Sequence, residues 1–66
     1  MMNTIQFRDK NDRCLATKDY SFLVIPHIGT DIYFDLKRYF VTDVRIAYKK
    51  DRQFVIVNVE EVNELD

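Results

Sequence analysis

Apolar and polar residues alternate along much of this chain with a period of two, the period of a β-strand that buries one face. Residues 3–8 show this alternation, and the polar turn at residues 9–12 predicts a hairpin to a second strand over residues 13–17. Residues 20–25 are apolar at nearly every position, which is typical of a strand covered on both faces. Pro26 lacks an amide proton and should end that strand.

The second half of the chain predicts further strands joined by tight turns. Gly29 is the only glycine, and we expect a positive φ angle or a close chain crossing there. The alternation then resumes and breaks at a predicted turn over residues 35–38. It slips by one position at residues 42–43, where we expect a β-bulge or a corner. The all-charged residues 49–52 predict a hairpin to a last strand over residues 54–59.

Residues 31–40 allow a second interpretation. Ile32, Leu36 and Phe40 are spaced four apart, as on one face of a helix, and Asp31 can cap its N-terminus. The dense aromatic residues in this segment favour strands. We therefore predict strand–turn–strand here, with a helix as the alternative.

About five short strands with polar turns predict an all-β fold, a five-stranded small barrel, because curling a small sheet hides most of its edges. The alternative is an α+β fold with a helix at residues 31–40. Residues 1–66 should form a single small domain, with residues 60–66 as an acidic C-terminal tail. The predicted core consists of apolar side chains on the strands and the loop after Pro26: Ile5, Phe7, Leu15, Phe22, Val24, Ile28, Ile32, Phe34, Val41, Val44, Ile46, Val55 and Val57.

Two motifs within residues 25–59 follow each other in a recognisable order. A Pro-x-x-Gly loop begins at Pro26, and Tyr39, Val41 and Val44 form a Tyr-x-Val-x-x-Val strand before the charged hairpin. This order resembles the SH3-like small β-barrel proteins of uncharacterised bacterial and phage type. The resemblance implies an SH3-like barrel but no function. The chain departs from ligand-binding SH3 domains, because it has no Trp and no Ala-Leu-Tyr-Asp-Tyr-like stretch.

The amino-acid composition excludes several classes of functional site. The 66 residues are 47% hydrophobic and 32% charged with a net charge of −1, which is typical of a globular chain without an overall electrostatic preference for nucleic acid or membrane. One Cys excludes an internal disulfide and a multi-thiolate zinc site, and one His excludes a multi-histidine site. The sequence shows neither a secretory signal nor a membrane-spanning run, so we expect a cytoplasmic protein without a membrane partner.

Two side chains are candidates for catalysis. His27 lies near Asp31 and Asp35 in the sequence and can act as a base or a metal ligand, yet four residues of strand separate the two carboxylates by about 13 Å, too far for one ion. Cys14 can become a nucleophile if basic neighbours such as Arg13 lower its pKa. The simpler explanation is that His27 is a solvated loop histidine and that Cys14 is a small residue on a half-buried strand. We therefore predict no enzyme, no metal, no cofactor and no small-molecule ligand.

Charge is distributed unevenly along the chain. Residues 1–55 carry ten basic and seven acidic residues, a balance of +3, whereas residues 56–66 carry four acidic residues and no basic one. The basic hairpin is therefore a candidate for weak, sequence-nonspecific nucleic-acid binding, with tyrosine for base stacking. The simpler explanation is a solvated hairpin that keeps a sheet edge from pairing. The candidate residues are Arg45, Tyr48, Lys49, Lys50 and Arg52.

The surplus of apolar residues gives the main functional hypothesis. Several runs are apolar at consecutive positions, so about half of these side chains must face outward from a single sheet. Either the acidic tail or the N-terminal hairpin covers them, or they form a contact surface. We predict a non-enzymatic interaction module that binds protein, including a second copy of itself, through an apolar outer face. The candidate residues are Leu23, Phe40, Phe54 and Ile56.

Overall fold

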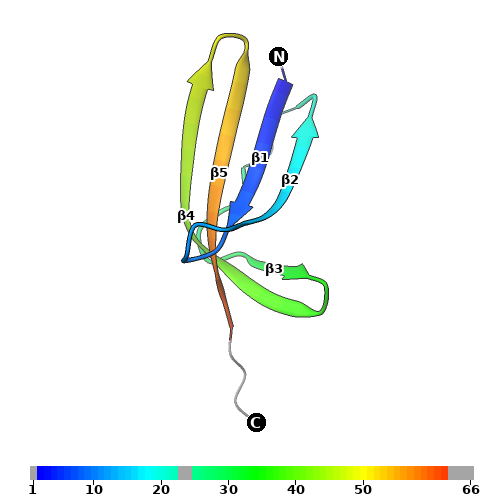
Figure 1. Cartoon of the computed structure of the whole chain (residues 1–66), viewed down its shortest axis with the longest axis vertical. Helices are drawn as coiled ribbons and strands as arrows, with labels where there is room; N and C mark the ends of the chain where they lie inside the picture. Colours follow the sequence, from blue (N-terminus) through cyan, green and yellow to red (C-terminus); the bar gives the residue numbers. More distant parts are fainter. Residues whose placement is uncertain (1, 23–24, 63–66) are drawn as a thin grey trace.

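The computed structural model describes residues 2–22 and 25–62, and in these residues all regular structure is β-strand (Figure 1). The strands are β1 (Met2–Arg8), β2 (Cys14–Tyr20), β3 (Asp31–Phe34), β4 (Lys37–Lys49) and β5 (Arg52–Glu61). The predicted all-β fold is confirmed. The alternative helix over residues 31–40 is wrong, because Asp35 and Leu36 adopt positive φ angles of 53° and 80° and form a tight hairpin turn between β3 and β4.

The five strands form one mixed sheet in the order β2-β1-β5-β4-β3. All neighbouring strands are antiparallel except β1 and β5, which run parallel over seven residue pairs from Met2↔Arg52 to Arg8↔Asn58. Parallel neighbours require a long connection, and here the whole of β2, β3 and β4 provides it. The first and last strands of the chain therefore lie side by side at the centre of the sheet.

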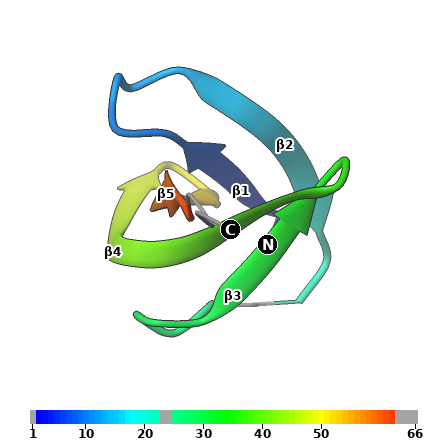
Figure 2. The ribbon, with the colours of Figure 1, turned by 90° about the horizontal axis from the view of Figure 1, so that it is seen from below.

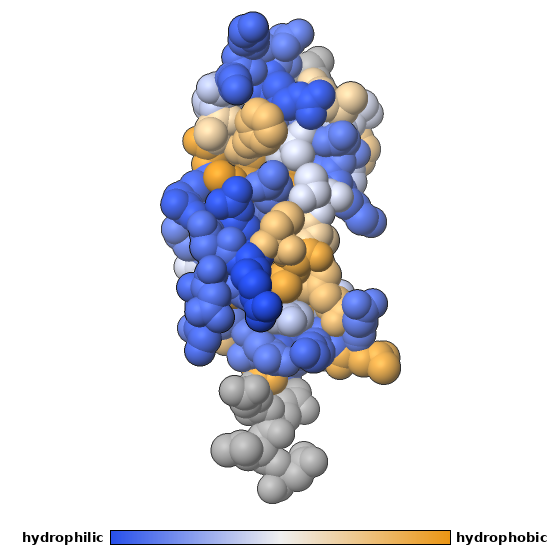
Figure 3. All heavy atoms as spheres, viewed as in Figure 1, coloured by the Kyte–Doolittle hydropathy of each residue, from blue (hydrophilic) through white to orange (hydrophobic). Residues whose placement is uncertain are grey.

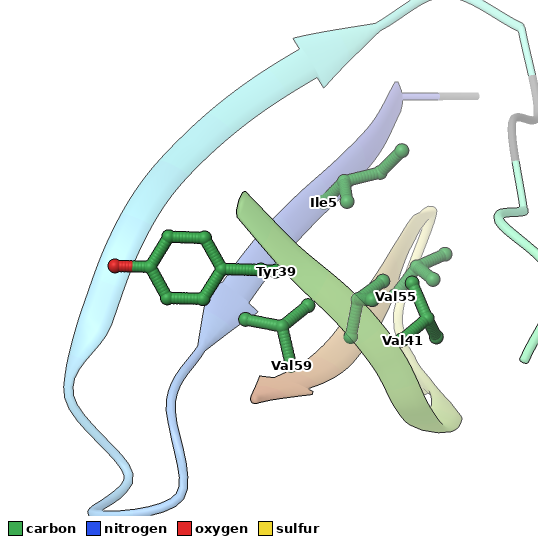
Figure 4. Packing of buried hydrophobic residues seen from close by; sticks show 6 residues of the cluster. Ile5, Tyr39, Val41, Val55 and Val59 are labelled. Atoms are coloured by element: carbon green, nitrogen blue, oxygen red, sulfur yellow. The ribbon is translucent and has the colours of Figure 1, made fainter. Parts of the chain in front are cut away.

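The sheet curls into a half-barrel, and its concave face carries the core (Figure 2). Alternate residues of the two central strands point to this face, so Ile5 of β1 packs with the valines of β5. Half-buried apolar residues, among them Phe7, Phe34 and Val44, pack against this cluster. The buried apolar side chains, all six of which are drawn in Figure 4, are Ile5, Tyr39, Val41, Val55, Val57 and Val59.

Contacts between aromatic rings connect strands that are not neighbours in the curled sheet. Phe7 of β1 and Phe34 of β3 are separated within the sheet by β5 and β4, yet their ring centroids lie 5.2 Å apart. Phe34 also packs edge-on against Tyr39 at 5.4 Å. Both distances are favourable for aromatic pairs. These contacts hold β3 across the concave face and exclude water from one end of the core.

A β-bulge bends β4, as the slip in the alternation predicted. Val41 pairs with Val59 and Asp43 pairs with Asn58, so Thr42 is the additional residue on β4. Below the bulge, β4 and β3 swing beneath the ends of β1 and β2 (Figure 1). The predicted hairpin at residues 49–52 is also confirmed, with Lys49 paired to Arg52.

The described residues of the apolar run at positions 20–25 do not form the predicted strand, and residues 23–24 lie outside the described part of the chain. Tyr20 ends β2, which is longer than the predicted residues 13–17, and the chain bends at Ser21 and Phe22. A continuous apolar run contains no periodicity, so only its length and composition suggested a strand. Before β3, Gly29 has the expected positive φ of 91° and donates its amide to the Val41 carbonyl at 2.8 Å.

Several predicted core residues are exposed instead. Phe22 and Ile28 lie on the β2–β3 connection with 63% and 68% of their surface exposed, because that segment is not a strand of the sheet. Leu15 sits where the β1–β2 register shifts, and Ile46 lies on the part of β4 that β3 does not cover. Val24 is outside the described residues. Conversely, the prediction omitted Tyr39 and Val59, which are buried.

The predicted tail at residues 60–66 begins inside a strand. Glu60 and Glu61 are the last two residues of β5, paired with Phe40 and Tyr39 of β4. The Val62 amide donates to the Arg38 carbonyl at 2.8 Å. Residues 63–66 are outside the described part of the chain.

We predict that Phe34→Ala destabilises the protein by about 2 kcal/mol, less than the roughly 3–5 kcal/mol of a fully buried Phe, because Phe34 is only half-buried. Urea unfolding measures this. The matched control is Tyr33→Ala on the next residue, whose side chain points to the opposite face and is 68% exposed, with an expected cost within about 0.5 kcal/mol. Equal costs for the two variants would show that the aromatic contact does not close the barrel.

Candidate functional site

The predicted apolar outer face is only partly assembled. Phe54 and Ile56 are two residues apart on β5 and point to the convex face, where both are half-buried. Phe40 also points to that face and is half-buried, but it pairs with Glu60, beyond the polar Asn58. In Figure 3, apolar side chains form separate areas between hydrophilic ones. Leu23 is outside the described residues.

Polar groups of β1 flank this face and explain the half-burial. Thr4 pairs with Phe54 across the parallel ladder and is itself buried. Its hydroxyl donates to Asp19 Oδ1 at 2.7 Å and accepts from Arg52 Nη1 at 3.0 Å. Gln6 pairs with Ile56 in the same way. The convex face is therefore a mixed surface with a small apolar centre.

The register places the predicted nucleic-acid residues Arg45, Lys49 and Arg52 on the convex face but Tyr48 on the concave face. Arg45 donates to Asn58 Oδ1 at 3.0 Å, and Arg52 contacts the Thr4 hydroxyl and lies 3.8 Å from Asp19, so both cations have partners. Tyr48 is opposite Gln53 on the concave side, the other face from Arg45. This arrangement separates the stacking group from the arginines.

Lys49 and Lys50 are exposed at the tip of the β4–β5 hairpin, beside the exposed Asp51. Lys50 has a positive φ of 55° in this turn. Two lysines next to an acid give a small positive charge, far from the continuous basic stripe of a strong nucleic-acid surface.

His27 and Cys14 lie apart from any cluster of potential ligands. His27 is exposed on the β2–β3 connection, and its carbonyl accepts the Thr30 amide at 3.1 Å. Cys14 is exposed rather than half-buried as predicted, because β2 is an edge strand, and its sulfur lies 3.2 Å from the Thr17 hydroxyl. Over residues 2–22 and 25–62, no three His, Cys, Asp or Glu residues are grouped to hold a metal ion.

An open pocket of about 460 Å³ lies at one end of the half-barrel. The β1–β2 hairpin, the start of β4 and the end of β5 form its walls, with the Tyr39 ring extending from β4 toward β2 (Figure 4). Both signs of charge line it, with Arg13 and Lys37 among the cations and Glu60 and Glu61 among the anions. Such a lining favours no particular ligand.

Asp9 organises the hairpin at that pocket. Its Oδ1 accepts the amides of Asn11 at 2.9 Å and of Arg13 at 3.0 Å. The hydrogen bond from the Arg13 amide is the largest influence on the Asp9 carboxyl, and together with the Asn11 amide and the Arg13 charge it lowers the pKa of this group below its ordinary value of 3.8. The role of Asp9 is thus to fix the turn.

The outer edge of β4 stands out from the rest of the sheet. β4 has 13 residues and β3 has four, and β3 pairs only with Lys37–Phe40. Val41 exchanges hydrogen bonds with Gly29 and Thr30. Within the described residues, the segment from Thr42 to Lys49 pairs with β5 alone, and Figure 1 shows no described strand beside it. We call this outer side of residues 42–49 the free edge.

The other two edges of the sheet are protected and the free edge is not. β2 carries Lys18 on its concave side, opposite Ile5, and its register with β1 is interrupted by a bulge. Inward-pointing lysines, bulges and short strands prevent edge pairing, and β3 is only four residues long. On the free edge the concave positions are Val44, Ile46 and Tyr48, which carry no charge.

Sequence reasoning assigned Val44 and Ile46 to the core and Tyr48 to a nucleic-acid surface. Val44 is half-buried against the core, but Ile46 is 40% and Tyr48 is 71% exposed. The alternation over residues 44–48 was a visible signal for a strand with one apolar face. The alternation did not show that β3 begins only at Asp31, so that its pairing with β4 reaches no further than Phe40.

Comparison with known proteins identifies no relative. No protein-family model matches the chain, and neither do curated proteins or solved structures. The resemblance to SH3-like barrels therefore stays a prediction. The described residues contain no helix capable of spanning a membrane.

We predict that Asp9→Ala lowers the melting temperature at neutral pH and that this loss shrinks in acid. A carboxyl group whose pKa is lower in the folded than in the unfolded state stabilises the fold above the unfolded value. That contribution disappears as the pH falls below 3.8 through the folded pKa of Asp9. Thermal unfolding between neutral pH and pH about 2 measures the difference in melting temperature between variant and original chain, with Asp51→Ala in the β4–β5 hairpin as the control. A difference independent of pH would contradict this role.

Proposed function

We propose that this chain is a non-enzymatic protein-interaction module that adds an extended protein strand to the free edge of β4. The supporting observation is the difference in length between β4 and β3, which leaves residues 42–49 without a second strand on the side away from β5 among the described residues. Strand addition gives affinity through main-chain hydrogen bonds. Ile46 and Tyr48 then supply apolar contact beside the added strand.

The proposed surface differs from the predicted outer face. Phe54 and Ile56 belong to a central strand, and polar residues of β1 lie beside them. On a central strand both sides of the backbone are already paired, so only side chains are available for contact. The free edge offers both backbone groups and exposed apolar side chains, which is why it supports a protein partner better.

The alternative, a weak nucleic-acid binder, is less well supported. Arg45 and Arg52 are paired with groups of this chain, and Tyr48 points to the other face of the sheet. Phosphate binding by the remaining Lys49 and Lys50 would be weak and would fall steeply with salt.

We predict that a capped peptide with the sequence of residues 42–49 binds the full chain at the free edge. Two-dimensional NMR titration should shift the amide signals of residues 42–49 and leave those of the β2 edge unchanged. The same peptide N-methylated at alternate residues is the control, since it cannot complete the backbone ladder. Shifts on β2, equal binding of the methylated peptide, or no binding would overturn the proposal.

Ile46→Lys should weaken binding of that peptide roughly tenfold, because it creates the inward-pointing charge that protects β2. Ala47→Lys is the matched control. Ala47 lies on the other face of β4, opposite Phe54, and is already exposed. Equal effects of the two lysines would mean that the concave side of the free edge is not the contact.

A further inference from the structure

We infer that the strand added to the free edge is β4 of a second copy of this chain, paired antiparallel about a two-fold axis at Ile46. This inference rests on the proposed function and names the partner of the same edge. Two identical strands that pair antiparallel form an isologous contact, which closes a dimer without leaving either edge open. The two sheets would then be continuous across the axis.

The position of the axis is restricted by the covered part of β4. In an antiparallel pair, residues opposite each other point to the same face, so a symmetric pairing must be centred on one residue. Val41 already bonds to Gly29 and Thr30, and β3 covers the residues before it. A centre at Ile46 uses residues 43–49 of both copies, all of which lie beyond the bulge.

Charge complementarity selects this centre. It places Asp43 opposite Lys49 of the second copy, and symmetry repeats the pair. Asp43 and Lys49 lie on the convex face and are exposed, so they can meet without burial. Opposite charges at directly paired positions stabilise a sheet and like charges destabilise it.

The neighbouring registers lack this complementarity. A centre at Arg45 places the two copies of Arg45 opposite each other. It also places Lys49 opposite Val41, whose backbone already bonds to Gly29 and Thr30. A centre at Ala47 sets Arg45 against Lys49 twice. Both registers bring like charges together across the strands. The charges along the free edge therefore favour one register of self-pairing.

Apolar side chains agree with the same register. A centre at Ile46 places Val44 of one copy opposite Tyr48 of the other on the concave face, again twice. Pairs of a β-branched and an aromatic residue are favourable across antiparallel strands. Tyr48, which is 71% exposed in the single chain, would gain a neighbour. Arg45 would face Ala47, so no cation would oppose it.

Charge reversal tests the register. In sedimentation velocity of the full chain over a concentration series, Asp43→Lys and Lys49→Asp should each raise the dimer dissociation constant roughly tenfold, since each creates two like-charge pairs. A chain carrying both substitutions, and an equimolar mixture of the two single variants, should recover the original constant, because opposite charges face each other again. Lys18→Asp and Asp51→Lys are the matched controls and should leave it unchanged.

A disulfide reports the same axis without relying on charge. In a Cys14→Ser background, Ile46→Cys should form a crosslinked dimer on mild oxidation, because facing residues in antiparallel strands have Cα atoms about 4.5–5.5 Å apart. Val44→Cys is the control. In this register its two copies are four residues apart along the strands, about 13 Å, too far for a disulfide. Faster crosslinking at residue 44 than at residue 46 would overturn the register.

The outcomes separate this inference from the function on which it rests. If the peptide of residues 42–49 binds the free edge but the full chain stays a monomer at every concentration, the inference is wrong and the edge serves another protein. If the chain dimerises and neither the mixture nor the double substitution restores the constant, the interface lies elsewhere. Binding of single-stranded DNA that is lost when Lys49 and Lys50 become Glu, in a chain that stays monomeric, would favour the nucleic-acid alternative and overturn both.

Discussion

The parallel ladder between β1 and β5 is the constraint on which the rest of the structure depends. It joins β1 to β5 and places Ile5 beside Val55 and Val57, which are almost completely buried. Because β1 already pairs with β2 on its other side, and β5 with β4, the ladder unites two antiparallel hairpins into one sheet. Without it neither hairpin has a second apolar surface to bury, and isolated two-stranded hairpins are at best marginally stable in water.

Curling allows this small sheet to bury its apolar face on itself. A flat sheet of five strands would leave one apolar face open to water, whereas the bulge at Thr42 bends β4 and brings β3 across the concave side. The contact between Phe7 and Phe34 then closes that side with two aromatic rings. Closure is incomplete, since β3 is only four residues long and lies against the lower part of β4.

The proposed interaction follows from the same incomplete closure. A strand of 13 residues beside one of four leaves part of β4 paired on one side only among the described residues, and the sequence there lacks the inward-pointing lysine that protects β2. Natural sheets seldom leave such an edge unprotected. The alternation of Asp43, Arg45 and Lys49 on one face with Val44, Ile46 and Tyr48 on the other gives the edge both a preferred register and an apolar side.

The sequence by itself determined the local features: the period-two alternation, the charged hairpin at residues 49–52, the slip that becomes the bulge, and the positive φ of Gly29. Each of these features depends on a few residues that are neighbours in the sequence, and on the steric and turn preferences of those residue types. Only the tertiary structure decided that Phe22 and Ile28 lie outside the strands, that Tyr39 and Val59 are buried, and that Ile46 stays exposed. Burial depends on which strands become neighbours, and the parallel pairing of β1 with β5 joins residues about fifty positions apart, a distance at which alternation within one strand carries no information.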